Sequence, residues 1–136
     1  MPFDTVDKLL FDSSVCGIIE FRIYSKNLYG ITDMNQEAEK ITGYDINEIL
    51  SLPHKIDISK MIYDEDVNIV VNEIASLVLT GKSEKIEYRI ISRSGDIHWI
   101  SGKFILVENT DFVESAPSCI INSFVCIDDR KEAEEN

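Results

Sequence analysis

The spacing of apolar residues changes from helical to strand-like part-way along the chain. Between Val67 and Val78 the apolar positions recur at i, i+3, i+4, i+7, i+10 and i+11, which places them on one face of a helix. This helix should begin at Asp64, where acidic residues suit its positive end, and should end at Gly81. After Gly81, apolar and charged residues alternate over 86–90, which predicts a strand.

The same criteria divide the rest of the chain into strands and short helices. Segments rich in β-branched and aromatic residues predict strands at 16–24, 28–34, 97–107 and 119–127. Helical segments are expected at 1–16, 35–41, 46–50, 58–61 and 130–136. Asn35 suits the start of a helix and Gly43 its end, and Ser94-Gly95 suits a tight turn between two strands.

The order of these elements predicts an α+β fold. Two strands are followed by several helices and then by three strands, and the short links between the last strands favour antiparallel pairing. Helices gathered in the middle of the chain would form one layer over one face of the sheet. A length of 136 residues fits one domain, which we divide into an N-terminal cap (1–15), a central domain (16–128) and the start of a C-terminal helix (129–136).

Charge, cysteine content and the lack of motifs argue against several classes of function. A net charge of −12 disfavours binding to nucleic acid and to anionic membranes, and no apolar run reaches the roughly 18 residues of a membrane span. The three cysteines lack CxxC spacing and the two histidines are dispersed, so we expect no disulfide framework and no zinc site, in a reducing cytoplasm. No nucleophile–base motif occurs, which indicates that the chain is not an enzyme.

Four short motifs follow one another along the chain. Residues 33–44 end in the letters ITGY, and residues 62–67 lead through DED into the long helix. Residues 87–99 contain EYR, then SG, then W, and residues 127–134 have the sequence IDDRKEAE. In this order and spacing the motifs resemble those of a PAS domain, over about residues 12–135, although Ile-Tyr at 62 and 63 replaces the His-Pro of the family.

The resemblance implies a five-stranded antiparallel sheet that curls around an apolar ligand pocket covered by the helices. Alternation along the predicted strands selects the pocket side and puts Trp99 on the opposite face. We interpret Cys126, which shares a side with Phe124, as a small buried residue. The expected pocket lining is Phe21, Ile31, Tyr44, Met61, Val70, Ile74, Tyr88, Ile90, Ile100, Phe104, Phe124 and Cys126.

Two cofactors of this family find no support in the sequence, and the cofactor is unknown at this stage. Haem-binding members usually carry the iron-ligating histidine on the long helix, whereas residues 64–80 contain no histidine and His54 suits a loop. Flavin sensors of the LOV type need a reactive cysteine among the helices, whereas residues 35–80 contain none. Cys119 and Cys126 are weak candidates for attachment of a photoactive-yellow type of chromophore.

The resemblance also implies a sensory module of a bacterial or archaeal signalling protein. Such a module would bind a small-molecule ligand or dimerise. It would then pass the signal through Asp128, Asp129 and Arg130 to an output domain outside this chain, of the histidine kinase or diguanylate cyclase type. We expect a homodimer built on the face of the sheet that carries Trp99 and on the N-terminal segment.

Two other functions stay open. The first is a ligand-free module that serves only dimerisation or protein contact. The second is a small cavity enzyme, which would need a buried carboxylate, Glu20 or Glu87, pointing into the pocket.

Overall fold

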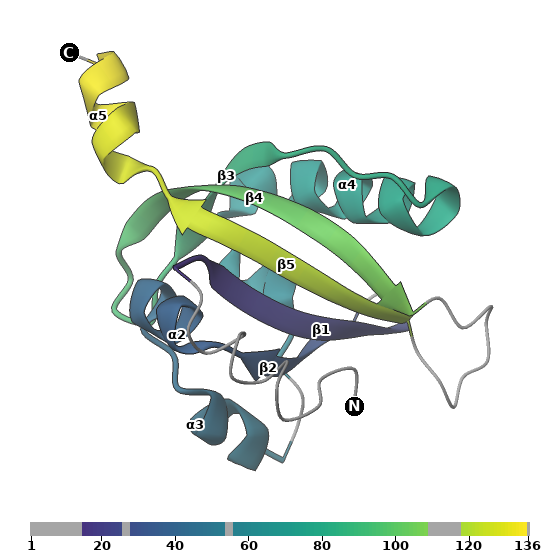
Figure 1. Cartoon of the computed structure of the whole chain (residues 1–136). Coiled ribbons are helices and arrows are strands. Elements are labelled where there is room, and N and C mark those ends of the chain that lie inside the picture. The colour runs from purple at the N-terminus through teal and green to yellow at the C-terminus, as the bar shows by residue number, and fades with distance from the viewer. Residues whose placement is uncertain (1–14, 26–27, 54–55, 109–117, 136) are drawn as a thin grey trace.

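An antiparallel sheet of five strands organises the protein, as Figure 1 shows for the computed structural model. The strands are β1 (Gly17–Ser25), β2 (Leu28–Met34), β3 (Ile86–Ile91), β4 (Ile97–Glu108) and β5 (Ser118–Cys126). Their order across the sheet is β2-β1-β5-β4-β3, so the last strand lies between the first and the fourth. The structure describes residues 15–25, 28–53, 56–108 and 118–135, and the predicted N-terminal helix lies outside them.

The helices between β2 and β3 cover the inner face of the sheet. They are α2 (Gln36–Thr42), α3 (Ile46–Ser51) and α4 (Val67–Thr80), with the 3₁₀ turns η1 (Ile58–Met61) and η2 (Asp64–Asp66). Their buried side chains and those of the sheet form one apolar core. A further helix, α5 (Asp128–Glu135), follows β5 directly and projects away from the sheet (Figure 1). The predicted α+β fold, with helices on one face of an antiparallel sheet, is confirmed.

Strand register decides which side chains enter the core. Tyr88 of β3 pairs with Ile100 of β4, and both are buried. On β4, Phe104 is also buried, whereas Ile97 and Ile105, which lie on the other face by alternation, are exposed. Of the helices in the described residues, none is long and apolar enough to cross a membrane.

The long helix begins later than the sequence predicted. Asp64–Asp66 form a 3₁₀ turn, and α4 starts at Val67. The side chain of Asp66 makes no capping bond to the helix, because its carboxylate accepts three hydrogen bonds from Arg89 instead. The end of the helix was predicted correctly, at Gly81, whose φ of 75° suits a residue without a Cβ.

Asn35 joins the start of β1 to the start of α2. Its Oδ1 accepts hydrogen bonds from the backbone N–H of Ile18 at 2.8 Å and of Ala38 at 2.9 Å. Its Nδ2 donates to the carbonyl oxygen of Cys16 at 2.9 Å. One fully buried side chain therefore caps α2 and provides hydrogen-bond partners for backbone groups at the start of β1.

We expect Asn35→Ala to lower the free energy of unfolding by about 2–4 kcal/mol, because it removes a helix cap and leaves strand groups without partners. Asp45→Ala is the matched control: Asp45 caps α3 by one bond, to the N–H of Asn47, and is exposed. The control should cost about 1 kcal/mol or less. Urea unfolding of both variants measures the difference, and equal losses would contradict the clamping role of Asn35.

Candidate functional site

A small apolar cavity lies between the inner face of the sheet and the helical segments. Its lining consists of Ile19, Thr42, Ile58, Met61, Ile62, Tyr88, Ile90, Ile100, Phe104, Asn122 and Phe124. The cavity volume is about 10 Å³, which is the space of roughly one water molecule. Tyr88 supplies a polar group by donating its hydroxyl hydrogen to Oδ1 of Asn122 at 3.0 Å, and burial raises the pKa of that hydroxyl.

Six of the twelve residues expected at the pocket line this cavity, and six do not. Those that line it are Met61, Tyr88, Ile90, Ile100, Phe104 and Phe124. Phe21, Ile31, Val70 and Ile74 are buried in the surrounding core, and Tyr44 is partly buried against it. The twelfth, Cys126, is exposed.

The prediction that Cys126 is buried is therefore wrong. Cys126 does pair with Ile100 across β4 and β5, so its register follows the expected alternation. It is, however, the last residue of β5, where the chain turns into α5 and leaves the thiol exposed. Alternation predicts the face of a strand on which a residue lies. It does not predict where the elements that bury this face end.

Five lining residues were not predicted from the sequence: Ile19, Thr42, Ile58, Ile62 and Asn122. Asn122 was missed because it is polar, although it lies two residues before Phe124 and so shares its face. Alternation alone could have found it. Thr42 and Ile58 come from helical segments whose packing no local pattern specifies.

Gly102 allows the polar pair in the cavity to form. A Cβ at this position would lie 2.9 Å from the hydroxyl oxygen of Tyr88 and 3.2 Å from Nδ2 of Asn122. Both atoms would have to move to make room for it. The bare backbone of β4 thus lets the Tyr88 side chain reach across the sheet to β5.

The junction between β5 and α5 is held by the backbone of Trp99. The Trp99 N–H donates to Oδ1 of Asp128 at 2.7 Å, and its carbonyl oxygen accepts from the N–H of Ile127 at 2.9 Å. The other carboxylate oxygen, Oδ2 of Asp128, lies 2.7 Å from Nδ1 of His98. Burial raises the pKa of Asp128, but the contacts with His98 and Trp99 outweigh it, and the pKa is lowered. We call Ile127, Asp128 and Trp99 the hinge.

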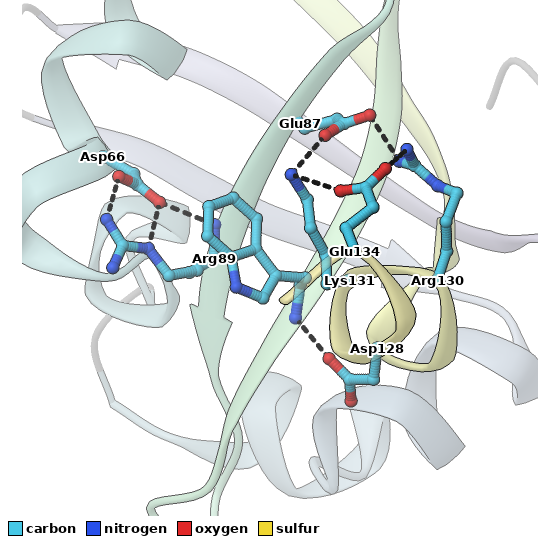
Figure 2. A network of polar contacts seen from close by, with 8 residues as sticks. Asp66, Glu87, Arg89, Asp128, Arg130, Lys131 and Glu134 are labelled. Atoms are coloured by element: carbon cyan, nitrogen blue, oxygen red, sulfur yellow. Dashed lines mark hydrogen bonds and ion pairs between the residues drawn. The ribbon is translucent and has the colours of Figure 1, made fainter. Parts of the chain in front are cut away.

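Charged residues attach the first turns of α5 to the sheet (Figure 2). Glu87 of β3 forms ion pairs with Arg130 and, at 2.8 Å, with Lys131. The hydrogen bonds from Lys131 and Arg130, of which the one from Lys131 has the larger effect, hold the pKa of Glu87 below its ordinary value. Nζ of Lys131 also lies 4.5 Å from the centre of the Trp99 ring, a cation–π contact.

Arg89 continues this network along β3 toward η2. Its guanidinium lies 4.9 Å from the ring centre of Trp99 and 4.2 Å from that of Tyr63. It also donates to both carboxylate oxygens of Asp66, at 2.9 and 2.8 Å (Figure 2). The outer face around Trp99 is therefore occupied by cations from β3 and α5.

Comparison with known proteins agrees with this architecture. The family model described as the PAS fold matches residues 31–114, which is more than half of the chain. The chain therefore belongs to the PAS fold family. A comparison with curated proteins gave no significant match.

Three solved structures illustrate the likeness. The PAS domain of a protein from Colwellia psychrerythraea superposes with a TM-score of 0.73 at 17% identity, covering 93% of this chain and 100% of that one. A sensory box histidine kinase/response regulator from Burkholderia thailandensis E264 gives a TM-score of 0.63 at 22% identity, covering 94% and 88%. The PAS domain of an HTR-like protein from Haloarcula marismortui gives 0.59 at 19% identity, covering 90% and 92%.

We expect Asp66→Asn to lower stability by about 1.5–3 kcal/mol at pH 7, because it weakens buried hydrogen bonds from a cation. The side-chain hydrogen bonds from Arg89 outweigh burial and hold the pKa of Asp66 below its ordinary value. The stabilisation is therefore complete above the unfolded pKa of about 3.9 and is lost as the pH falls through the lower, folded pKa.

The difference between wild type and variant should accordingly shrink below about pH 4. Glu65→Gln is the control, since Glu65 is exposed and lies 3.5 Å from the same guanidinium; it should change stability by less than about 0.5 kcal/mol. Urea unfolding from neutral to acid pH measures both. If the difference in unfolding free energy between wild type and Asp66→Asn stayed constant with pH, the lowered pKa of Asp66 would be contradicted.

Proposed function

We propose that this chain is a sensory PAS module whose signal leaves through α5. The signal passes through Asp128, Asp129 and Arg130 at the start of this helix. It then reaches an output domain outside this chain, of the histidine kinase or diguanylate cyclase type. Membership of the PAS fold family supports the sensory role, as do structural neighbours that are described as sensor histidine kinases. The division into 1–15, 16–128 and 129–136 belongs to the same proposal.

One arrangement carries this proposal: the cavity wall and the hinge share neighbouring residues of β4. The side chain of Ile100 lines the cavity. The residue before it, Trp99, holds the hinge through both its N–H and its carbonyl oxygen. Because the carbonyl of Trp99 and the N–H of Ile100 belong to one rigid peptide unit, a shift of the wall at Ile100 would alter the bond from Ile127 to that carbonyl oxygen, at the start of α5. If this peptide unit has two arrangements, an input that favours one of them would shift the population of the protein toward it.

The input is either a small ligand or a second protein surface. A mostly apolar lining with one polar pair is the usual composition of a ligand pocket, but a volume of about 10 Å³ would have to grow for any molecule larger than water.

The ligand-free alternative is favoured by the outer face of the sheet. There Ile97, Ile105, Val107 and Val125 are exposed and could bury one another in a homodimer.

The cavity-enzyme alternative has no comparable support. Among the described residues that line the cavity there is no carboxylate. Glu20 is buried, yet it lies between the core residues Ile19 and Phe21 and outside the lining. Glu87 pairs with Lys131 and Arg130 of α5 instead.

We expect Ile100→Val to loosen α5 although the substitution lies in the cavity. Removing one methyl group should cost about 0.5–1.5 kcal/mol, and it should reduce the helical Cα chemical shifts of residues 128–135. Ile74→Val is the matched control: Ile74 is equally buried, on α4, but does not line the cavity. NMR of both variants makes the comparison, and equal effects on α5 would refute coupling through β4.

We expect the purified chain to show no visible absorption band and to form a dimer. Native mass spectrometry should give twice the chain mass, and Val125→Glu should return the protein to a monomer by placing a charge in the contact. Lys82→Glu, at an exposed position after α4 and outside this face of the sheet, is the control for the added charge. An additional small mass per chain would favour the ligand-binding input, and a monomer would refute the dimer.

A further inference from the structure

We propose that His98, Cys126 and Asp128 form a binding site for one zinc ion beside the hinge. One potential ligand atom from each residue lies within 4.8 Å of the other two. His98 is on β4, Cys126 ends β5, and Asp128 begins α5. The site therefore joins three elements at the point where the chain leaves the sheet.

Strand pairing brings these residues together. Cys126 pairs with Ile100, and His98 lies two residues earlier on the same face of β4. The turn into α5 then returns Asp128 to within 2.7 Å of Nδ1 of His98. The sequence argued against a zinc site because its histidines and cysteines are dispersed; the fold supplies the cluster that their spacing does not.

The three side chains offer the ligand types that zinc accepts. Zinc binds cysteine sulfur, histidine nitrogen and carboxylate oxygen, and three protein ligands with one open position form a common arrangement. A soft thiolate together with an imidazole selects zinc over Mg²⁺ and Ca²⁺, which prefer oxygen. With Cys126 as thiolate and Asp128 ionised, the two negative charges would balance those of Zn²⁺.

The surroundings of Asp128 already orient its carboxylate. Oδ1 is held by the N–H of Trp99 at 2.7 Å, which leaves Oδ2 directed at His98. Outer contacts of this kind usually fix metal-binding carboxylates. His98 is half-buried and Cys126 is exposed, so solvent and a metal ion can reach the cluster and a water can complete the tetrahedron.

Zinc binding would require small movements only. Bonds of 2.0–2.3 Å to a tetrahedral ion place ligand atoms about 3–4 Å apart. Nδ1 of His98 and Oδ2 of Asp128, now in direct contact at 2.7 Å, would separate to admit the ion, and the thiol of Cys126 would turn toward it. The Trp99 bond to Oδ1 can persist throughout.

A bound zinc ion would tie β4, β5 and α5 together and restrict the hinge. This consequence rests on the proposed route of the signal through α5, whereas the binding site does not. Zinc affinity measured on this chain alone therefore tests the site without testing the relay.

The test is isothermal titration of the reduced chain of 136 residues with zinc sulfate, with native mass spectrometry for stoichiometry. We expect one ion per chain and at least about a tenfold weaker Kd for Cys126→Ser and for His98→Gln, the range that loss of a ligand or its support produces. Cys16→Ser and His54→Gln are the matched controls and should leave the Kd unchanged. No retained zinc, or an equal loss in the controls, would overturn the proposal.

A second measurement on the unaltered protein does not depend on how the variants fold. At mildly alkaline pH, which offsets the raised pKa of the Cys126 thiol, iodoacetamide should modify Cys126, while the buried Cys119 stays protected. One equivalent of zinc should slow modification of Cys126 about tenfold or more, and the same concentration of Mg²⁺ should not. Peptide mass analysis locates the label. A labelling rate of Cys126 that zinc leaves unchanged would refute the site.

Discussion

Strand β5 pairs with β1 on one side and with β4 on the other, and both ladders must be in register before the cavity or the hinge can exist. Gly17 faces Phe124 in the first ladder, and Ile100 faces Cys126 in the second. The fit is tight, since a Cβ at Gly17 would come within 2.6 Å of the Phe124 ring. A slip of one residue would turn Phe124 and Asn122 away from the cavity and carry Asp128 away from Trp99.

Strand β5 passes through two different chemical environments, one at its middle and one at its end. In its middle, Asn122 reaches Tyr88 inside an apolar core, where a hydrogen bond is strong and an unpaired group would be costly. At its end, the thiol of Cys126 is exposed, and the carboxylate of Asp128 lies against the imidazole of His98 from β4. The short backbone link between Ile100 and Trp99 connects these two environments. The proposed relay depends on that link, whereas the zinc ligands His98, Cys126 and Asp128 lie beside it.

Much of the fold could be predicted because its signals are local. The apolar stripe of α4, the glycine at its end and the turn at Gly95 each follow from a few neighbouring residues, and the structure has them all. The start of α4 was misplaced because Asp64–Asp66 form a 3₁₀ turn instead of the first turn of the helix. In this turn Asp66 accepts three hydrogen bonds from Arg89 of β3, a distant partner that no local pattern reveals, and charge-assisted bonds are the stronger ones.

For this protein, the sequence by itself determined the periods of its helices and strands, the motifs of the PAS family and the face on which residues such as Ile100 and Phe104 lie. Only the tertiary structure decided that Asn122 enters the cavity, that Val70 and Ile74 pack beside it, and that Cys126 is exposed. It alone also gathered His98, Cys126 and Asp128. The physical reason is that periodicity indicates the face of a helix or strand on which a residue lies. Whether its side chain is buried, and what it contacts, depends on residues far away in the chain.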